Sequence, residues 1–265
     1  MDYLNINRKL WNDKTSVHYQ SDFYDVKSFI KGKDSLNPIE IELLGDISGK
    51  SILHLQCHFG MDSISLARRG GMVTGIDLSD QSIKQAKDLN ERSGTKVDFI
   101  LSDVYSLPQN LNKQFDIIFT SYGTVGWLPD MDKWAGVIQH FLKPGGKFIM
   151  VEFHPVVWIF DDNFKEIIYK YSDIDPIIED LEGTYANREA DIKNRSVSWN
   201  HGLGTVLNAL LKKGLTIDSF QEYDYSPYNC FNNTIEVDEG KYQIKGLEGK
   251  IPMLYSLTIR KNVTK

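Results

Sequence analysis

Short apolar runs alternate along the chain with longer segments in which apolar residues recur every three or four positions. The short runs are typical of buried strands, and the longer segments are typical of helices with one buried face. The predicted strands lie at 51–56, 72–76, 97–101, 115–120, 147–153, 215–225 and 253–260. Strands that alternate with helices of this length predict an α/β fold with a mainly parallel sheet and right-handed crossovers.

Residues that favour helix ends support this interpretation. Ser79 is a good N-cap, and Asp80 follows it in the first turn, where a negative charge meets the positive end of the helix dipole. Ser35 is predicted to cap another helix, which ends near Gly45. Residues 143–146, Lys-Pro-Gly-Gly, end a further helix and turn the chain into the next strand.

The pattern weakens in three segments. Residues 1–34 are polar and aromatic with little periodicity, so we expect an arm or short helices lying over the domain. Residues 154–198 are irregular and rich in acids and aromatics, and residues 226–250 separate the last two predicted strands. We predict that these three segments form a lid on a domain that spans residues 35–265.

Composition narrows the class of protein. The 265 residues are 41% hydrophobic and 25% charged, enough apolar material for one α/β domain with insertions. The net charge of −6 disfavours a broad surface for nucleic acids or anionic membranes. Two cysteines, no signal-peptide pattern and no apolar run of about 18 residues lead us to expect a cytoplasmic protein without nucleic-acid or membrane partners.

The first two predicted strands carry the most informative chemistry. Residues 51–60, Ser-Ile-Leu-His-Leu-Gln-Cys-His-Phe-Gly, form a strand that ends in a turn and opens a helix, and the second strand ends at Ile76-Asp77. In an open α/β sheet, the first such turn approaches the anionic end of a nucleotide-like ligand, and the acid after strand two binds ribose hydroxyls. The combination predicts a cofactor of the adenosine type.

Several of these residues also have structural explanations. Asp77 could stabilise a helix N-terminus, Asp103 could close an Asx turn after the third strand, and Gly60 could serve a tight turn. His54 lies inside the first strand, where a hydrogen-bonded core histidine is expected. Because His54 and His58 lie on a strand and a turn rather than on one helix face, we predict no metal site.

These motifs resemble those of the class I S-adenosylmethionine-dependent methyltransferases over residues 45–220 and the final strand. The glycine-rich first turn of that family corresponds to residues 53–60, its ribose acid to Asp77 and its adenine-side acid to Asp103. Residues 142–146, Leu-Lys-Pro-Gly-Gly, are similar to its loop before strand five. The resemblance implies S-adenosylmethionine as cofactor and a Rossmann-like, doubly wound seven-stranded sheet, whose last strand is antiparallel beside strand five.

One part of the family pattern is altered. The usual Gly-x-Gly-x-Gly turn becomes Gln56-x-His58-x-Gly60, and Gln and His adopt a positive φ less readily than Gly. We expect either that these side chains replace lost backbone contacts or that the cofactor is slightly displaced. The predicted cofactor-binding residues are Gln56, His58, Phe59, Gly60, Asp77, Leu78, Asp103, Val104 and Ser121.

The acceptor is expected at the carboxyl edge of the same sheet. Tyr122 and Trp127 follow the fourth strand and Trp199 precedes a helix at this edge, and aromatic faces of this kind suit a cationic ligand. His154 and His201 lie at the same edge, and either is a candidate base for the incoming nucleophile. Methyl transfer is also an in-line displacement that positioning and desolvation can promote without a base.

We therefore predict methyl transfer from S-adenosylmethionine to a small molecule. The alternatives are a methyltransferase acting on RNA or protein, a nicotinamide-dependent oxidoreductase, and a non-catalytic relative that binds no S-adenosylmethionine. Base methylation in the family goes with an Asn/Asp-Pro-Pro-aromatic segment, where this chain has residues 121–124, Ser-Tyr-Gly-Thr. This chain lacks the Gly-x-Gly-x-x-Gly motif that is typical of nicotinamide-dependent oxidoreductases. The altered turn keeps the non-catalytic alternative open.

Overall fold

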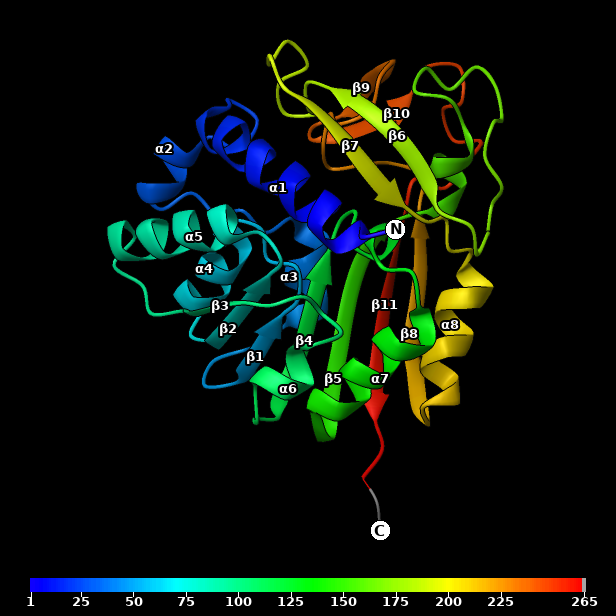
Figure 1. The fold of residues 1–265 in the computed structure, drawn as a ribbon. Coiled ribbons are helices and arrows are strands. Elements are labelled where there is room, and N and C mark those ends of the chain that lie inside the picture. Colours follow the sequence, from blue (N-terminus) through cyan, green and yellow to red (C-terminus); the bar gives the residue numbers. More distant parts are fainter. Residues whose placement is uncertain (264–265) are drawn as a thin grey trace.

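The apolar runs pair into one seven-stranded sheet in the computed structural model, which describes residues 1–263. Its strands are β1 (Ser51–His54), β2 (Met72–Asp77), β3 (Asp98–Leu101), β4 (Phe115–Ser121), β5 (Leu142–Phe153), β8 (Leu215–Tyr223) and β11 (Leu254–Lys261). They lie in the order β3-β2-β1-β4-β5-β11-β8 (Figure 1). Because β11 is antiparallel to β5 and β8 and the other neighbours are parallel, the predicted fold class is confirmed.

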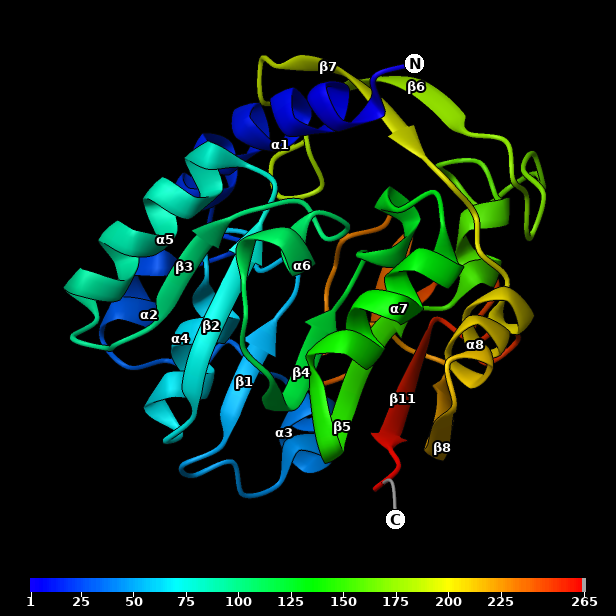
Figure 2. The same cartoon turned by 60° about the horizontal axis from the view of Figure 1, so that its bottom comes forward.

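Helices cover both faces of this sheet (Figure 2). One face carries α3 (Pro38–Leu44), α4 (Met61–Arg68) and α5 (Asp80–Arg92), and the other carries α6 (Leu107–Asn110), α7 (Met131–Phe141) and α8 (Leu203–Lys212). Successive strand residues point to opposite faces, so Ile52 packs with the first set of helices and Leu53 with the second. Burial of both faces explains why the strands are near-continuous apolar runs.

The two predicted insertions, residues 154–198 and 226–250, each contain an antiparallel hairpin. One pairs β6 (Ile177–Glu182) with β7 (Lys193–Ser198), and the other pairs β9 (Thr234–Asp238) with β10 (Lys241–Ile244). Short 3₁₀ helices, η1 (Val125–Trp127) and η2 (Pro155–Ile159), follow β4 and β5. The β6 strand alternates half-buried with exposed residues, and this short pattern lacks the continuous apolar run on which the strand predictions relied.

The N-terminal segment is also more regular than predicted. α1 (Tyr3–Gln20) crosses the carboxyl end of the sheet, where it packs against β7 and α5, and α2 (Val26–Ile30) follows it (Figures 1 and 2). The buried face of α1 is mostly polar, so this helix has little hydrophobic periodicity. The buried residues of α1 are Asn7, Leu10, Lys14, Thr15 and His18.

Predicted element ends agree with the structure where the capping chemistry is strong. Ser79 is the N-cap of α5, and its Oγ accepts a hydrogen bond from the backbone N of Ser82 at 2.9 Å. The prediction for Ser35 was wrong: α3 begins at Pro38 after Asn37, and the Ser35 hydroxyl instead contacts Ser65. No helix in the described part of the chain is long and apolar enough to cross a membrane.

Candidate active site

A cavity of about 900 Å³ lies at the carboxyl edge of the sheet. We call its floor the turns that follow the strands together with the start of α4, at residues 56–62, 77–78, 102–105 and 121–128. The roof of the cavity consists of α1, the strands β6 and β7, and the residues that connect these two strands. A volume of this size suits a small-molecule or cofactor site.

The cavity brings together nearly all the predicted site residues. Its lining includes the full predicted cofactor-binding set and the three predicted acceptor residues, Tyr122, Trp127 and Trp199. His201 also lines the cavity, whereas His154 does not. Residues from five separate parts of the chain therefore meet at the point where a parallel sheet is expected to bind its ligand.

The altered turn after β1 keeps a left-handed backbone. Gln56, His58 and Gly60 have φ values of 54°, 51° and 82°. For a residue other than glycine this conformation costs about 1–3 kcal/mol, so the surroundings have to stabilise it. The Gln56 side chain does so by donating from Nε2 to the carbonyl oxygen of Thr124 at 2.9 Å, and the His58 backbone N donates to Asp77 Oδ2 at 2.8 Å. These side-chain and backbone contacts stabilise the positive φ, which Gln and His adopt less readily than Gly.

Gly60 is required for packing. A Cβ atom at this position would lie 2.5 Å from Cζ of Phe99 and 3.0 Å from Cβ of Ala86. The start of α4 therefore rests directly on the aromatic ring of β3. This contact and the positive φ are sufficient reasons for glycine, independently of any ligand.

Asp77 lies at the end of β2 and faces the cavity. Its Oδ1 accepts a hydrogen bond from Ser79 N at 2.8 Å, and its Oδ2 accepts one from His58 N. Burial raises the pKa of Asp77 to about 6, although these backbone donors favour the charged form. Each carboxylate oxygen retains acceptor capacity, so the side chain fits a pair of ribose hydroxyls.

The carboxylate of Asp103 is used mainly by its own turn. Its Oδ1 accepts hydrogen bonds from Tyr105 N at 2.9 Å and Ser106 N at 3.0 Å, and its Oδ2 accepts one from the Ser106 hydroxyl. These hydrogen bonds form an Asx turn, which is the structural explanation for an acid at this position. The role of Asp103 toward adenine stays a prediction.

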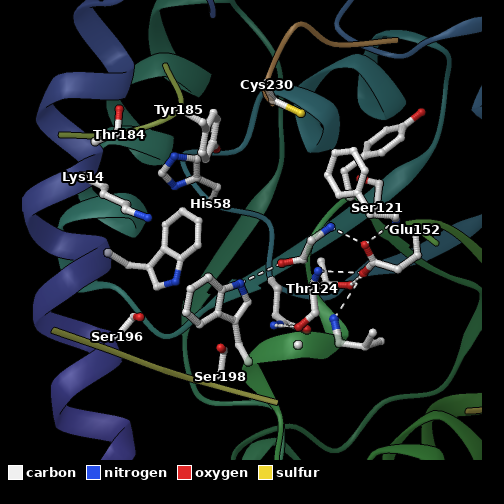
Figure 3. A pocket seen from close by; sticks show the side chains of 18 of the residues that line it. Lys14, His58, Ser121, Thr124, Glu152, Thr184, Tyr185, Ser196, Ser198 and Cys230 are labelled. Atoms are coloured by element: carbon white, nitrogen blue, oxygen red, sulfur yellow. Dashed lines mark hydrogen bonds between the residues drawn. The ribbon is translucent and has the colours of Figure 1, made fainter. Parts of the chain in front are cut away.

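Glu152, at the end of β5, fixes the floor segment after β4. Its carboxylate accepts hydrogen bonds from the backbone N of Gly123, from Thr124 N at 2.7 Å and from Val125 N at 3.2 Å (Figure 3). It also accepts from the Thr124 hydroxyl at 2.7 Å. In the same segment, Trp127 Nε1 donates to the Gly123 carbonyl at 2.7 Å. This network sets the position of the aromatic side chains on the floor.

The two candidate bases have different surroundings. His154 Nδ1 accepts from Val156 N at 3.2 Å, and its Nε2 lies 2.9 Å from Glu222 Oε1 in poor geometry for a hydrogen bond. Since His154 caps η2 and lies outside the cavity, we do not retain it as a catalytic candidate. His201 Nε2 donates to the Leu128 carbonyl at 2.7 Å, which leaves its Nδ1 as the acceptor nitrogen.

His58 connects the floor to the roof. Its Nε2 lies 3.0 Å from His18 Nδ1 on α1, and its Nδ1 lies 3.1 Å from Ser82 Oγ on α5. The pKa of His58 is lowered to about 3 and that of His18 to about 2, chiefly by burial and to a smaller extent by the positive charge of Lys14. A neutral histidine pair therefore joins α1 to the turn after β1.

Comparison with known proteins agrees with this geometry. Residues 52–146 match the family model of a methyltransferase domain. The chain is 33% identical over 128 residues to the ubiquinone biosynthesis O-methyltransferase of Bordetella pertussis, which covers 47% of this chain and 53% of that protein. The Nitrosomonas europaea protein of the same name is 34% identical over 131 residues, covering 47% and 54%. The chain thus matches about half the length of these curated relatives.

Solved structures share the fold over more of the chain. A S-adenosylmethionine-dependent methyltransferase from Clostridium acetobutylicum has a TM-score of 0.57 and 16% identity, covering 93% of this chain and 94% of its own. One from Mesorhizobium loti has a TM-score of 0.54 and 16% identity, covering 87% and 99%. The chain therefore has the fold of the S-adenosylmethionine-dependent methyltransferases, and residues 52–146 are similar to a methyltransferase domain. The names of these solved structures give S-adenosylmethionine as the cofactor of those proteins.

The floor of the cavity offers groups that fit S-adenosylmethionine. Besides Asp77, Gln56 lines the cavity with a buried Oε1 that has no hydrogen-bond partner within residues 1–263, so a ligand N–H or O–H would satisfy it. The roof adds the indole of Trp11, whose ring centroid lies 5.4 Å from that of Trp127. Carboxylate and amide oxygens accept hydrogen bonds from ribose hydroxyl and amino groups, and aromatic faces attract the sulfonium cation.

Asp62 is a site residue that the sequence interpretation missed. It lies in the first turn of α4, lines the cavity, and accepts a hydrogen bond from the Ser121 hydroxyl at 3.3 Å. Burial raises the pKa of Asp62 to about 6. The fully buried Glu40 is close enough for Asp62 to raise its pKa to about 7, after the larger effect of burial. These two acids would be stabilised by a cation, such as the amino group of the cofactor.

Proposed function

We propose that this chain transfers the methyl group of S-adenosylmethionine to an oxygen atom of a small molecule. The observation that carries the proposal is the single cavity in which Asp77 and Asp62 lie on the same floor as Tyr122 and Trp127. The curated relatives are named as O-methyltransferases, which favours oxygen as the acceptor atom. The roof supports a small acceptor, because α1 packs against β7 over the site.

Each group on the floor would have a distinct task. When bound, S-adenosylmethionine supplies an activated methyl group on a sulfonium cation. Asp77 accepts hydrogen bonds from the ribose, and Asp62 with Ser121 holds the amino group at the other end of the cofactor. The segment that Glu152 fixes presents Trp127 toward the cation.

The chain's remaining tasks are to orient the acceptor and to hold its proton. Trp199 and Tyr122 line the space above the floor, and the roof limits the access of water. His201 is the candidate base, since the hydrogen bond from its Nε2 to Leu128 leaves the lone pair of Nδ1 available. Alignment of donor and acceptor supplies the main catalytic contribution in this proposal.

Calorimetric titration with S-adenosylhomocysteine tests the proposal. The parent should bind, and Asp77→Ala should bind roughly 30-fold or more weakly, because two charge-assisted hydrogen bonds are lost. Asp98→Ala is the matched control, since Asp98 is exposed on the neighbouring strand β3. Absence of binding by the parent would favour the non-catalytic alternative. Equal affinity of the parent and Asp77→Ala for S-adenosylhomocysteine would show that Asp77 does not bind the cofactor.

A further inference from the structure

Lys14 is a buried cation without a counter-ion. Lys14 is 6% exposed. Its Nζ lies 5.1 Å from the ring centroid of Trp11, 5.9 Å from that of Trp127 and 6.0 Å from that of Tyr185. Within residues 1–263, Nζ has no ion-pair partner within 4.0 Å. Figure 3 shows Lys14 extending from α1 into the cavity, toward the space that His58 and Tyr185 also face.

The charged and titratable groups around Lys14 do not neutralise it. Glu179 on β6 is the acid that favours its charged form, but this carboxylate is beyond ion-pair distance and accepts a hydrogen bond from the Tyr169 hydroxyl at 2.7 Å. His18 and His58, on the other side, are kept neutral by burial. Burial lowers the pKa of Lys14 to about 8, so most of the side chain is still protonated at neutral pH.

The cofactor makes this lone charge more significant. A sulfonium in the same cavity would repel the ammonium, and the repulsion is strong where water is excluded. The acids Asp62 and Glu40 lie on the floor side and are matched by the amino group of the cofactor in the proposed function. The methionine carboxylate of the cofactor is expected at the start of α4 on the floor, so the acceptor is the component of the reaction that can supply an anion to Lys14 on the roof.

The surroundings of Lys14 also suit an anionic oxygen. Thr184, and Ser196 and Ser198 of β7, line the same cavity, and Ser196 Oγ donates to the Glu179 carbonyl at 3.5 Å. A single ammonium matches a carboxylate, which carries one charge, better than a phosphate dianion. The rings of Trp127 and Tyr185 provide flat walls for an aromatic acceptor.

Building on the proposed function, we propose that Lys14 recognises the carboxylate of the acceptor, which is a hydroxylated aromatic acid. The carboxylate lies at Lys14 and the hydroxyl group points toward the floor, where the methyl group arrives. Lys14 is a specificity residue in this arrangement, and it takes no part in bond making.

The test compares acids with their amides. Salicylate, para-hydroxybenzoate and protocatechuate, each beside its carboxamide, are titrated calorimetrically into the protein with and without S-adenosylhomocysteine. At least one acid should bind about tenfold or more tightly than its amide, because the amide cannot form the charge-assisted contact. Lys14→Met should abolish that preference and Lys14→Arg should retain part of it. Lys9→Met is the control, as Lys9 lies on the same helix, is 69% exposed and pairs with Asp13.

Separate readouts distinguish the two proposals. If no acid is preferred over its amide while S-adenosylhomocysteine binds normally, the acceptor inference is wrong and the proposed function stands. Retention of the preference in Lys14→Met would also overturn it, as would a loss of S-adenosylhomocysteine affinity in this variant, which would assign Lys14 to the cofactor. Failure of the parent to bind S-adenosylhomocysteine would contradict the proposed function itself. Thermal unfolding of each variant confirms that it is folded.

Discussion

The floor of the cavity rests on buried apolar strands whose turns are fixed by polar side chains, whereas the roof is held chiefly by polar side chains. On the floor, the turn after β1 is fixed by contacts to Thr124 and Asp77. In the roof, α1 is fixed to β7 by Asn7, whose Nδ2 donates to the Val197 carbonyl at 2.8 Å and whose Oδ1 accepts from Val197 N at 3.0 Å. The difference indicates that the floor is determined by the fold, and that the roof can vary with the acceptor.

Replacing Glu152 should cause the largest effect and would show how far the floor depends on one carboxylate. Glu152→Ala leaves several buried N–H groups around Thr124 without an acceptor, so we expect the free energy of unfolding to fall by about 4 kcal/mol. Denaturant unfolding measures this loss. The control is Glu222→Ala, since the Glu222 side chain is 47% exposed. A loss below about 1 kcal/mol would mean that the floor is held by its strands alone.

The contrast between floor and roof also explains what the sequence could predict. The strands and the cap at Ser79 follow from local patterns, because apolar runs and capping side chains act over a few residues. Glu152 could not be assigned its role, since it binds a turn that is distant in sequence. Asp62 resembles any acid in a helix first turn, and only its burial beside Ser121 distinguishes it.

The roof was less predictable for a physical reason. α1 buries Asn7, Lys14 and His18, so its packing leaves no hydrophobic period to detect. His154 lies at the end of β5, where a site residue is expected, but its ring faces Glu222 and it does not line the cavity. Position along the chain indicates the edge of the sheet on which a residue lies, but the direction of its side chain depends on packing.

Asn7→Ala should have an intermediate effect and would test whether the roof is a separate layer. It leaves the backbone N and carbonyl of Val197 unpaired, so we expect the free energy of unfolding to fall by about 2 kcal/mol. Affinity for S-adenosylhomocysteine should change by less than about threefold, because the floor holds the cofactor in our proposal. Calorimetry and denaturant unfolding measure both quantities, with Asn5→Ala, at an exposed position of α1, as control. A joint loss of stability and cofactor affinity would show that roof and floor act as one unit.

The smallest effect concerns the histidine pair that joins the two regions. His18 and His58 have pKa values of about 2 and 3 in the folded chain, chiefly because of burial, against about 6.5 for an exposed histidine. As pH falls below about 6.5, the unfolded chain binds protons that the folded chain does not bind, so the free energy of unfolding decreases with each step down in pH. His18→Phe should make this dependence shallower by up to about 1.4 kcal/mol per pH unit between pH 6 and 5.

The difference between parent and variant cancels the opposite contribution of the buried acids Asp62 and Asp77, which both proteins share. Unfolding curves at these two pH values measure it, with His140→Phe as an exposed control. An unchanged slope would mean that His18 binds protons equally in the folded and unfolded chains, so that the roof is joined to the floor by its other contacts only.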